Sequence, residues 1–164
     1  MDISKYLERK GLGYEHLSKE ERKAISDFAL VWSLFEAQLL DENGSSKKIL
    51  EKCKDWSANE GIDEITIDKH LSYFQNRYIE NNETNNKFEH LHFRKNDFPD
   101  LVKETLKGNT NDASSKLACC LIIILRFRNN YFHGIKWAYQ FKDQQENFEL
   151  SCALSTDCMD KYAY

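Results

Sequence analysis

Residues 18–40 carry apolar side chains at steps of three and four, which is the pattern of an amphipathic helix. Ser18 with Glu21 three residues later is a capping box, so the helix is predicted to begin there and to run to about Leu40. The periodic positions are Ile25, Phe28, Ala29, Trp32, Phe35, Glu36 and Leu39. Glu36 breaks the apolar stripe, and a carboxylate at such a position needs a partner, because an unpaired buried charge is costly.

A second helix is predicted from Ala113 to about Phe132, opened by Asn111-Asp112 and closed by Gly134. It is apolar nearly all round between Leu117 and Leu125, so neighbouring elements must cover most of its surface. We expect the helices Ser18–Leu40 and Ala113–Phe132 to pack side by side as the core.

Four shorter helices are predicted, over about 46–56, 67–80, 96–108 and 144–161. Polar, asparagine-rich residues 81–86 indicate a loop, residues 88–93 show no clean period, and 62–67 is interpreted as a loop rather than a brief strand. With one proline and six glycines in the chain, a turn-rich β-sandwich is disfavoured. The predicted fold is an all-α, antiparallel helical bundle with a loop-rich insertion in the middle.

Composition narrows the function. A formal net charge of −4 disfavours a protein that coats nucleic acid through many phosphate contacts, but it allows a local site for one phosphate. No apolar stretch reaches the length of a membrane span, and the charged N-terminus lacks a signal region, so a cytoplasmic protein is expected. The five cysteines show no CxxC spacing and are interpreted as reduced, mostly packing thiols. His90 and His92 have no third ligand in view, so no metal or cofactor is predicted.

The central helix ends in polar residues directly after hydrocarbon, in the stretch LRFRNNYFHGIK. Arg126, Arg128 and His133 suit the negative end of a helix dipole. Asn129 and Asn130 do not, because asparagine is a poor helix former. A site that needs hydrogen-bond donors and a titratable ring would account for them.

Arg128 followed by four residues and His133 is an Rx4–6H motif, with Asn129 directly after the arginine. In the setting RFRNNYFHGIKW, at the end of an apolar helix, it resembles the signature of the HEPN superfamily. Within that superfamily, the resemblance is to the Apea-like, RNase-type domains. The segment FALVWSLFEAQL, including Phe35-Glu36, resembles the first core helix of that family. The resemblance covers these two helices and, more weakly, the tail from 136 to about 158, whereas residues 45–110 match nothing in it.

The resemblance implies a single HEPN-like helical domain over 1–164 that pairs as a homodimer, with the two motifs meeting across the dimer axis. The resemblance also implies one of two functions: that of a metal-independent endoribonuclease, as in many members, or that of a non-catalytic module that binds a nucleotide or a protein, as in others. The family is frequent in toxin–antitoxin and antiphage systems. RNA is therefore the expected substrate, and an antitoxin or other protein is a candidate partner.

The residue types fit RNA cleavage. A guanidinium matches the equatorial phosphate oxygens bidentately, and an imidazole can move a proton near neutral pH. Arg128 and His133 lie about 140° apart around one helix, so two copies are needed to aim them at one phosphate. Asn129, four residues before His133, could orient the imidazole or donate to the phosphate. Glu36 is expected to pair with Arg128 or Arg126, either to orient the guanidinium or only to satisfy a charge.

Two alternatives stay open. On local physics alone, the arginines complement the helix dipole and His133 is a capping residue. Within the family, the chain could be a non-catalytic module, which its net negative charge would favour. Tyr131, Phe132 and Trp137 are interpreted as core or dimer contacts rather than surfaces on which bases stack.

Overall fold

The computed structural model describes residues 1–11, 13–133 and 144–163. The expected closing residue Gly134, Trp137 and the start of the family-like tail lie outside the described residues. The elements in chain order are α1 (Ile3–Lys10), the 3-10 turn η1 (Tyr14–His16), α2 (Lys19–Leu39), α3 (Ser46–Asn59), α4 (Glu64–Tyr78), β1 (Ile79–Glu80), β2 (Glu83–Thr84), α5 (Asn86–Glu89), the 3-10 turn η2 (Lys95–Asp97), α6 (Pro99–Leu106), α7 (Ala113–Phe132) and α8 (Gln145–Tyr162). The predicted all-α class is confirmed.

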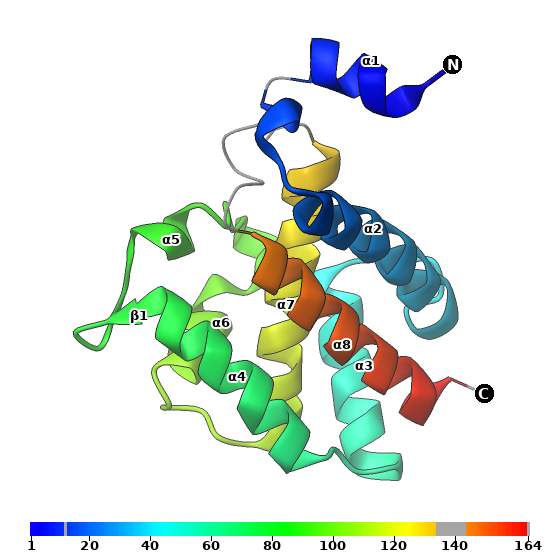
Figure 1. Cartoon of the computed structure of the whole chain (residues 1–164). Coiled ribbons are helices and arrows are strands. Elements are labelled where there is room, and N and C mark those ends of the chain that lie inside the picture. Colours follow the sequence, from blue (N-terminus) through cyan, green and yellow to red (C-terminus); the bar gives the residue numbers. More distant parts are fainter. Residues whose placement is uncertain (12, 134–143, 164) are drawn as a thin grey trace.

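Helix α7 is the centre of the molecule, as its sequence requires. Every residue from Leu117 to Phe127 is buried, and α3, α4 and α6 pack around it (Figure 1). Burying such a continuous apolar surface stabilises the fold by about 25 cal/mol per Å² removed from water. The all-round apolar pattern of this helix therefore reflects cover on several sides.

The two longest helices do not pack side by side as expected. The main partner of α2 is α8, and the close neighbours of α7 are α3, α4 and α6. Phe148 of α8 joins the two, with its ring centroid 5.0 Å from that of Phe28 on α2 and 6.4 Å from that of Phe127 on α7. The apolar stripe of α2 therefore faces α8 to a large extent, although its end reaches α7 through a polar contact described below.

Two predicted helix ends are confirmed, whereas the helix predicted over 67–80 begins earlier, at Glu64, so the interpretation of 62–67 as a loop is wrong for its second half. The backbone N–H of Glu21 donates to Ser18 Oγ at 3.0 Å, and the N–H of Ser18 donates to Glu21 Oε2 at 2.8 Å, which completes the capping box. Gly108 directly follows Lys107, the C-cap of α6. Its φ is +81°, a backbone conformation that residues with a Cβ rarely adopt.

The middle of the chain is loop-rich mainly between residues 79 and 98, where a two-stranded hairpin, α5 and η2 follow one another. The rest of 45–110 is helical and belongs to the bundle. The rings of Phe88 and Phe93 stack with centroids 5.0 Å apart, and Phe88 meets Tyr78 at 6.1 Å. The short elements are thereby fixed to the bundle, next to the last turns of α7.

Helix α1 stands apart from the bundle and buries no residue (Figure 1). Arg22 ties it to α2: its Nη1 lies 3.0 Å from Glu8 Oε1, and its guanidinium lies over the ring of Tyr14 at 4.2 Å. None of the helices in the described residues is long and apolar enough to cross a membrane.

Candidate active site at the end of α7

The Arg128 guanidinium lies between α7 and α2. Its Nη2 lies 3.5 Å from Glu36 Oε2, and the pair is partly shielded, with 31% of the Arg128 and 16% of the Glu36 side chain exposed. Of the two arginines expected as partners for Glu36, the structure thus selects Arg128. This contact between α7 and α2 explains why Glu36 interrupts the apolar stripe of α2.

Glu36 is itself held by two further donors. The Trp32 indole Nε1–H donates to Oε2 at 2.9 Å, and the Gly44 backbone N–H donates to Oε1 at 2.9 Å. A Cβ at Gly44 would come within 2.8 Å of Glu36 Cδ, which is closer than real Cβ atoms lie to such neighbours. The absence of a side chain at Gly44 therefore lets the turn after α2 approach the Glu36 carboxylate. The two hydrogen bonds hold that carboxylate in one position.

The other contacts of Arg128 also fix its orientation. Nη1 donates to Asn129 Oδ1 at 3.1 Å, and the guanidinium carbon lies 5.2 Å from the ring centroid of Phe132, a cation–π distance. Nε is buried and donates no hydrogen bond within the described residues. The side chain is thus oriented on several sides but not saturated with acceptors.

His133 is placed differently from the rest of the motif. It is the C-cap of α7, its backbone N–H donates to the Asn129 carbonyl at 3.0 Å, and its side chain is exposed. Among the described residues no hydrogen bond joins its imidazole to Arg128 or Asn129. The structure therefore brings Arg128, Asn129 and Glu36 together and leaves His133 facing solvent at the helix end.

Arg126 belongs to a separate, buried cluster. Its Nε donates to the Leu91 carbonyl at 3.0 Å, and its Nη1 lies 2.9 Å from Asp97 Oδ2. Asp97 also accepts the Ser46 hydroxyl at 3.0 Å and the Arg94 N–H at 2.9 Å. Burial lowers the pKa of Arg126, and the charge of Asp97 opposes that shift. Of the two arginines offered as partners for Glu36, Arg126 is thus not the one, because its carboxylate partner is Asp97.

Asn130 shares this structural role. Its Nδ2 donates to the Leu91 carbonyl at 3.1 Å and to the His90 carbonyl at 3.4 Å. Together with Arg126 it fixes the segment after α5 to the last turns of α7. The two asparagines that are poor helix formers thus have different contacts: Asn130 holds the loop after α5, and Asn129 accepts a hydrogen bond from Arg128.

Sequence reasoning missed Trp32 as a polar partner, Gly44 and Asp97. Trp32 occupies the core, as its periodic position predicts, but nothing in that position shows that its N–H meets Glu36. Asp97 falls at the start of the helix predicted over 96–108, where an aspartate is expected to cap rather than to pair with a buried arginine. A buried arginine in an otherwise hydrocarbon helix was the available indication that a carboxylate elsewhere had to meet it.

His90 and His92 follow α5 and lie near each other. The rings of His90 and His92 lie 6.5 Å apart and nearly perpendicular. Within the described residues no group of three or more histidine, cysteine, aspartate or glutamate side chains is arranged to hold a metal ion.

No family model, no curated protein and no solved structure matches this chain. The site must therefore be interpreted from its own residues and from the motif resemblance.

Proposed function

We propose that this chain is a metal-independent endoribonuclease of the HEPN type, with Arg128, Asn129 and His133 as its site. It acts as a homodimer in the cytoplasm, as the effector of a toxin–antitoxin or antiphage system, with an antitoxin or other protein as its partner. Two copies are needed because Arg128 faces α2 while His133 faces solvent at the helix end.

The observation that carries the proposal is the state of the Arg128 guanidinium. It is oriented by Glu36, Asn129 and Phe132 and yet keeps 31% of its side chain exposed. An arginine that only complements the helix dipole needs no carboxylate, amide and aromatic ring around it. Such an arrangement suits a guanidinium that must meet a phosphate with its fork in a defined plane.

The residues then divide the work as follows. Arg128 binds the non-bridging phosphate oxygens and stabilises the charge that develops on them during in-line attack. One His133 takes the proton from the 2′-hydroxyl as its oxygen bonds to phosphorus, and the partner's His133 gives a proton to the departing 5′-oxygen. The products are a 2′,3′-cyclic phosphate end and a 5′-hydroxyl end. DNA is not cut because it lacks the attacking hydroxyl.

A second candidate function has an observation of its own in its favour. Both terminal nitrogens of Arg128 already have acceptors, Glu36 Oε2 and Asn129 Oδ1, and the chain carries a net charge of −4. A non-catalytic HEPN module that binds a nucleotide or a protein partner would need neither a free guanidinium nor a basic groove for RNA.

Cleavage of a labelled RNA in excess EDTA separates the two functions. Activity should persist with chelator, leave cyclic phosphate ends and fall about 10²–10⁴-fold in His133→Ala, because a general acid or base is lost. His16→Ala is the matched control, since it removes an exposed imidazole outside the motif. Cleavage that EDTA abolishes, or that His133→Ala leaves at the parent rate, would favour the binding module.

Mixing two inactive variants tests the composite site. Arg128→Ala and His133→Ala homodimers each lack one group entirely, whereas a mixed dimer holds one arginine and one histidine. Mixed samples should exceed both homodimers in activity but stay below the parent, because the one remaining His133 supplies only one of the two proton transfers. Light scattering should show a dimer, and cleavage by a monomeric species would contradict a site shared between copies.

A further inference from the structure

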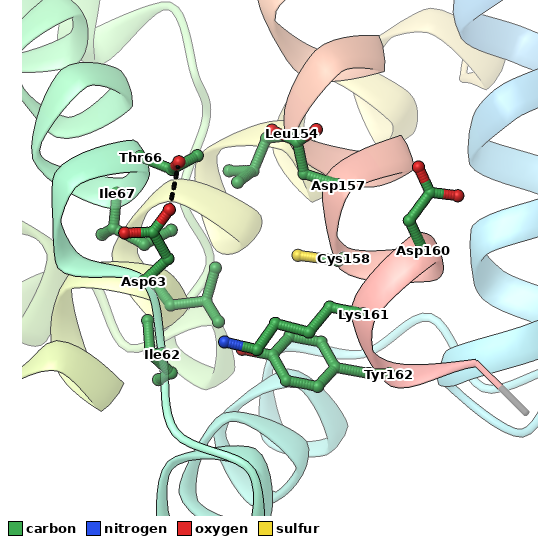
Figure 2. Close-up of a pocket in the computed structure, with 11 residues that line it drawn as sticks. Ile62, Asp63, Thr66, Ile67, Leu154, Asp157, Cys158, Asp160, Lys161 and Tyr162 are labelled. Atoms are coloured by element: carbon green, nitrogen blue, oxygen red, sulfur yellow. Dashed lines mark hydrogen bonds between the residues drawn. The ribbon is translucent and has the colours of Figure 1, made fainter.

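A hollow lies at the opposite end of α7 from Arg128. It has a volume of about 330 Å³ and is formed by the start of α4, Leu117 of α7 and the last turns of α8 (Figure 2). Leu117 precedes Arg128 by eleven residues, about 16 Å along the helix axis. The hollow is therefore separate from the candidate active site, and its volume is at the lower end of the range of small-molecule sites.

The floor of the hollow is apolar. Ile67, Leu117 and Leu154 are buried there. Tyr162 supplies an aromatic wall, which is rigid because its ring stacks on Trp56 at 4.5 Å and its hydroxyl donates to the Gly61 carbonyl at 3.0 Å. A ligand would thus meet hydrocarbon below and the ring of a fixed tyrosine at the side.

The Cys158 thiol points into the hollow (Figure 2). It is buried, and within the described residues it makes no hydrogen bond. Burial raises its pKa to about 12, so it is a neutral thiol at physiological pH. It can offer a weak S–H donor or a soft apolar contact to an occupant, but it is not a nucleophile.

The rim carries three carboxylates and one ammonium. Asp63 is engaged as the N-cap of α4, accepting the Thr66 hydroxyl at 2.6 Å and the Ile65 N–H at 3.1 Å. Asp157 and Asp160 form no ion pair with any other described residue and are exposed. The mouth of the hollow therefore carries a net negative charge, and two of its carboxylates have no cationic partner among the described residues.

Lys161 already places a cation at this mouth. Its Nζ lies 5.5 Å from the ring centroid of Tyr162, and its side chain extends across the front of that ring toward Ile62 and Asp63 (Figure 2). The protein's own ammonium thus occupies the position that favours a cation, between an aromatic face and carboxylates. Lys161 is exposed and flexible enough to leave it.

We propose that this hollow binds a small organic cation, an amine or guanidine carried on a compact apolar body. The apolar body occupies the floor formed by Ile67, Leu117, Leu154 and the Cys158 thiol. The cationic group takes the place of the Lys161 ammonium beside Tyr162, and its carboxylate partner is Asp63, toward which the Lys161 side chain extends (Figure 2). The inference does not depend on the proposed cleavage activity, because it rests on a different end of the molecule.

The test uses the full chain with 2-phenylethylamine as the probe and 2-phenylethanol as its neutral counterpart. Binding is followed by titration with NMR detection of the α8 amides. The amine should bind at least about tenfold more tightly than the alcohol, because both fill the floor but only the amine carries the charge. Equal affinity of the two probes would overturn the proposal.

Variants sharpen the test in opposite directions. Lys161→Met removes the competing ammonium and should tighten amine binding, whereas Asp63→Asn should weaken it by about threefold to tenfold. Asparagine is also a favoured N-cap, so the start of α4 is kept in that variant. Asp160→Asn is the matched control, since it also removes one rim carboxylate, but one that lies on the other side of the hollow from the Lys161 ammonium (Figure 2). The proposal fails if the amine binds neither the parent nor Lys161→Met, or if Asp160→Asn weakens binding as much as Asp63→Asn.

Discussion

Arg126 and Arg128 stand two residues apart on α7 and have opposite surroundings. Only 4% of the Arg126 side chain is exposed, and it meets Asp97 at 2.9 Å and the Leu91 carbonyl at 3.0 Å. Arg128 keeps 31% of its side chain exposed and meets Glu36 at the longer distance of 3.5 Å. The first arginine joins a loop to the core, whereas the second is oriented and remains accessible.

The difference separates a closed arginine cluster from an open one. Every carboxylate oxygen of Asp97 has a donor from the protein, so the Arg126 cluster is closed. In the Arg128 cluster the carboxylate is well held, but the guanidinium has a buried Nε without an acceptor within the described residues. Under the proposed function, a phosphate would approach the exposed part of the Arg128 side chain, whereas the Arg126 side chain is almost wholly covered.

Arg126→Met should cause the largest loss of stability. It leaves the Asp97 carboxylate buried without its cation, which costs about 3–5 kcal/mol of unfolding free energy. Chemical denaturation followed by far-UV circular dichroism measures this change. Arg126→Lys keeps the charge but loses the Nε bond to Leu91, so it should fall between Arg126→Met and the parent. A Met variant as stable as the parent would show that the buried pair contributes little.

Arg128→Lys should do the reverse. The charge is kept in this variant and the pair with Glu36 is partly exposed, so the free energy of unfolding should change by at most about 1 kcal/mol. The rate of RNA cleavage should nevertheless fall about 10²-fold, because the fork geometry is lost while the charge remains. Denaturation and cleavage on the same preparation give both values. A lysine variant with parental cleavage would mean that the guanidinium fork is not used.

Gly44→Ala should disturb the Arg128 cluster from outside the motif. The new Cβ would collide with the Glu36 carboxylate, which must move away from the Gly44 N–H and Arg128. We expect a loss of about 1–3 kcal/mol from the unsatisfied N–H and a reduced cleavage rate. Gly61→Ala, where a Cβ meets no atom within 4 Å but φ is +74°, controls for a glycine substitution that affects only the backbone. Parental cleavage in Gly44→Ala would separate Glu36 from the function of Arg128.

The smallest effect concerns pH and His70, a buried titratable side chain outside both arginine clusters. Burial lowers the pKa of His70 below its ordinary 6.5, with Asp157 opposing the shift and Lys69 adding to it. Since the unfolded chain binds this proton more readily, stability should be full above about pH 6.5 and fall as pH drops toward the lowered pKa, by at most about 1.4 kcal/mol per pH unit. His70→Gln should flatten that part of the stability profile, while Arg126→Lys should leave its slope unchanged.

The sequence predicted the elements better than their partners. The capping box, the α7 bounds and the polar misfit Glu36 all follow from local spacing, and all are found in the structure. The pairing of α2 with α8 was not predicted, because periodicity shows which face of a helix is buried and not which helix covers it. The role of Arg126 could not be distinguished from that of Arg128 for the same reason, since it depends on Asp97, 29 residues away in the chain.

The hydrogen bond from Trp32 to Glu36 makes the candidate site optically readable. The indole donates to Oε2, the same oxygen that faces Arg128, so a ligand that draws the guanidinium away changes the electrostatic field at the chromophore. Trp56, stacked on Tyr162, stands in the same relation to the hollow at the other end of α7. A variant that keeps only Trp32 would thus report on the candidate site by its intrinsic fluorescence. A variant that keeps only Trp56 would report on the hollow, and neither needs an attached dye.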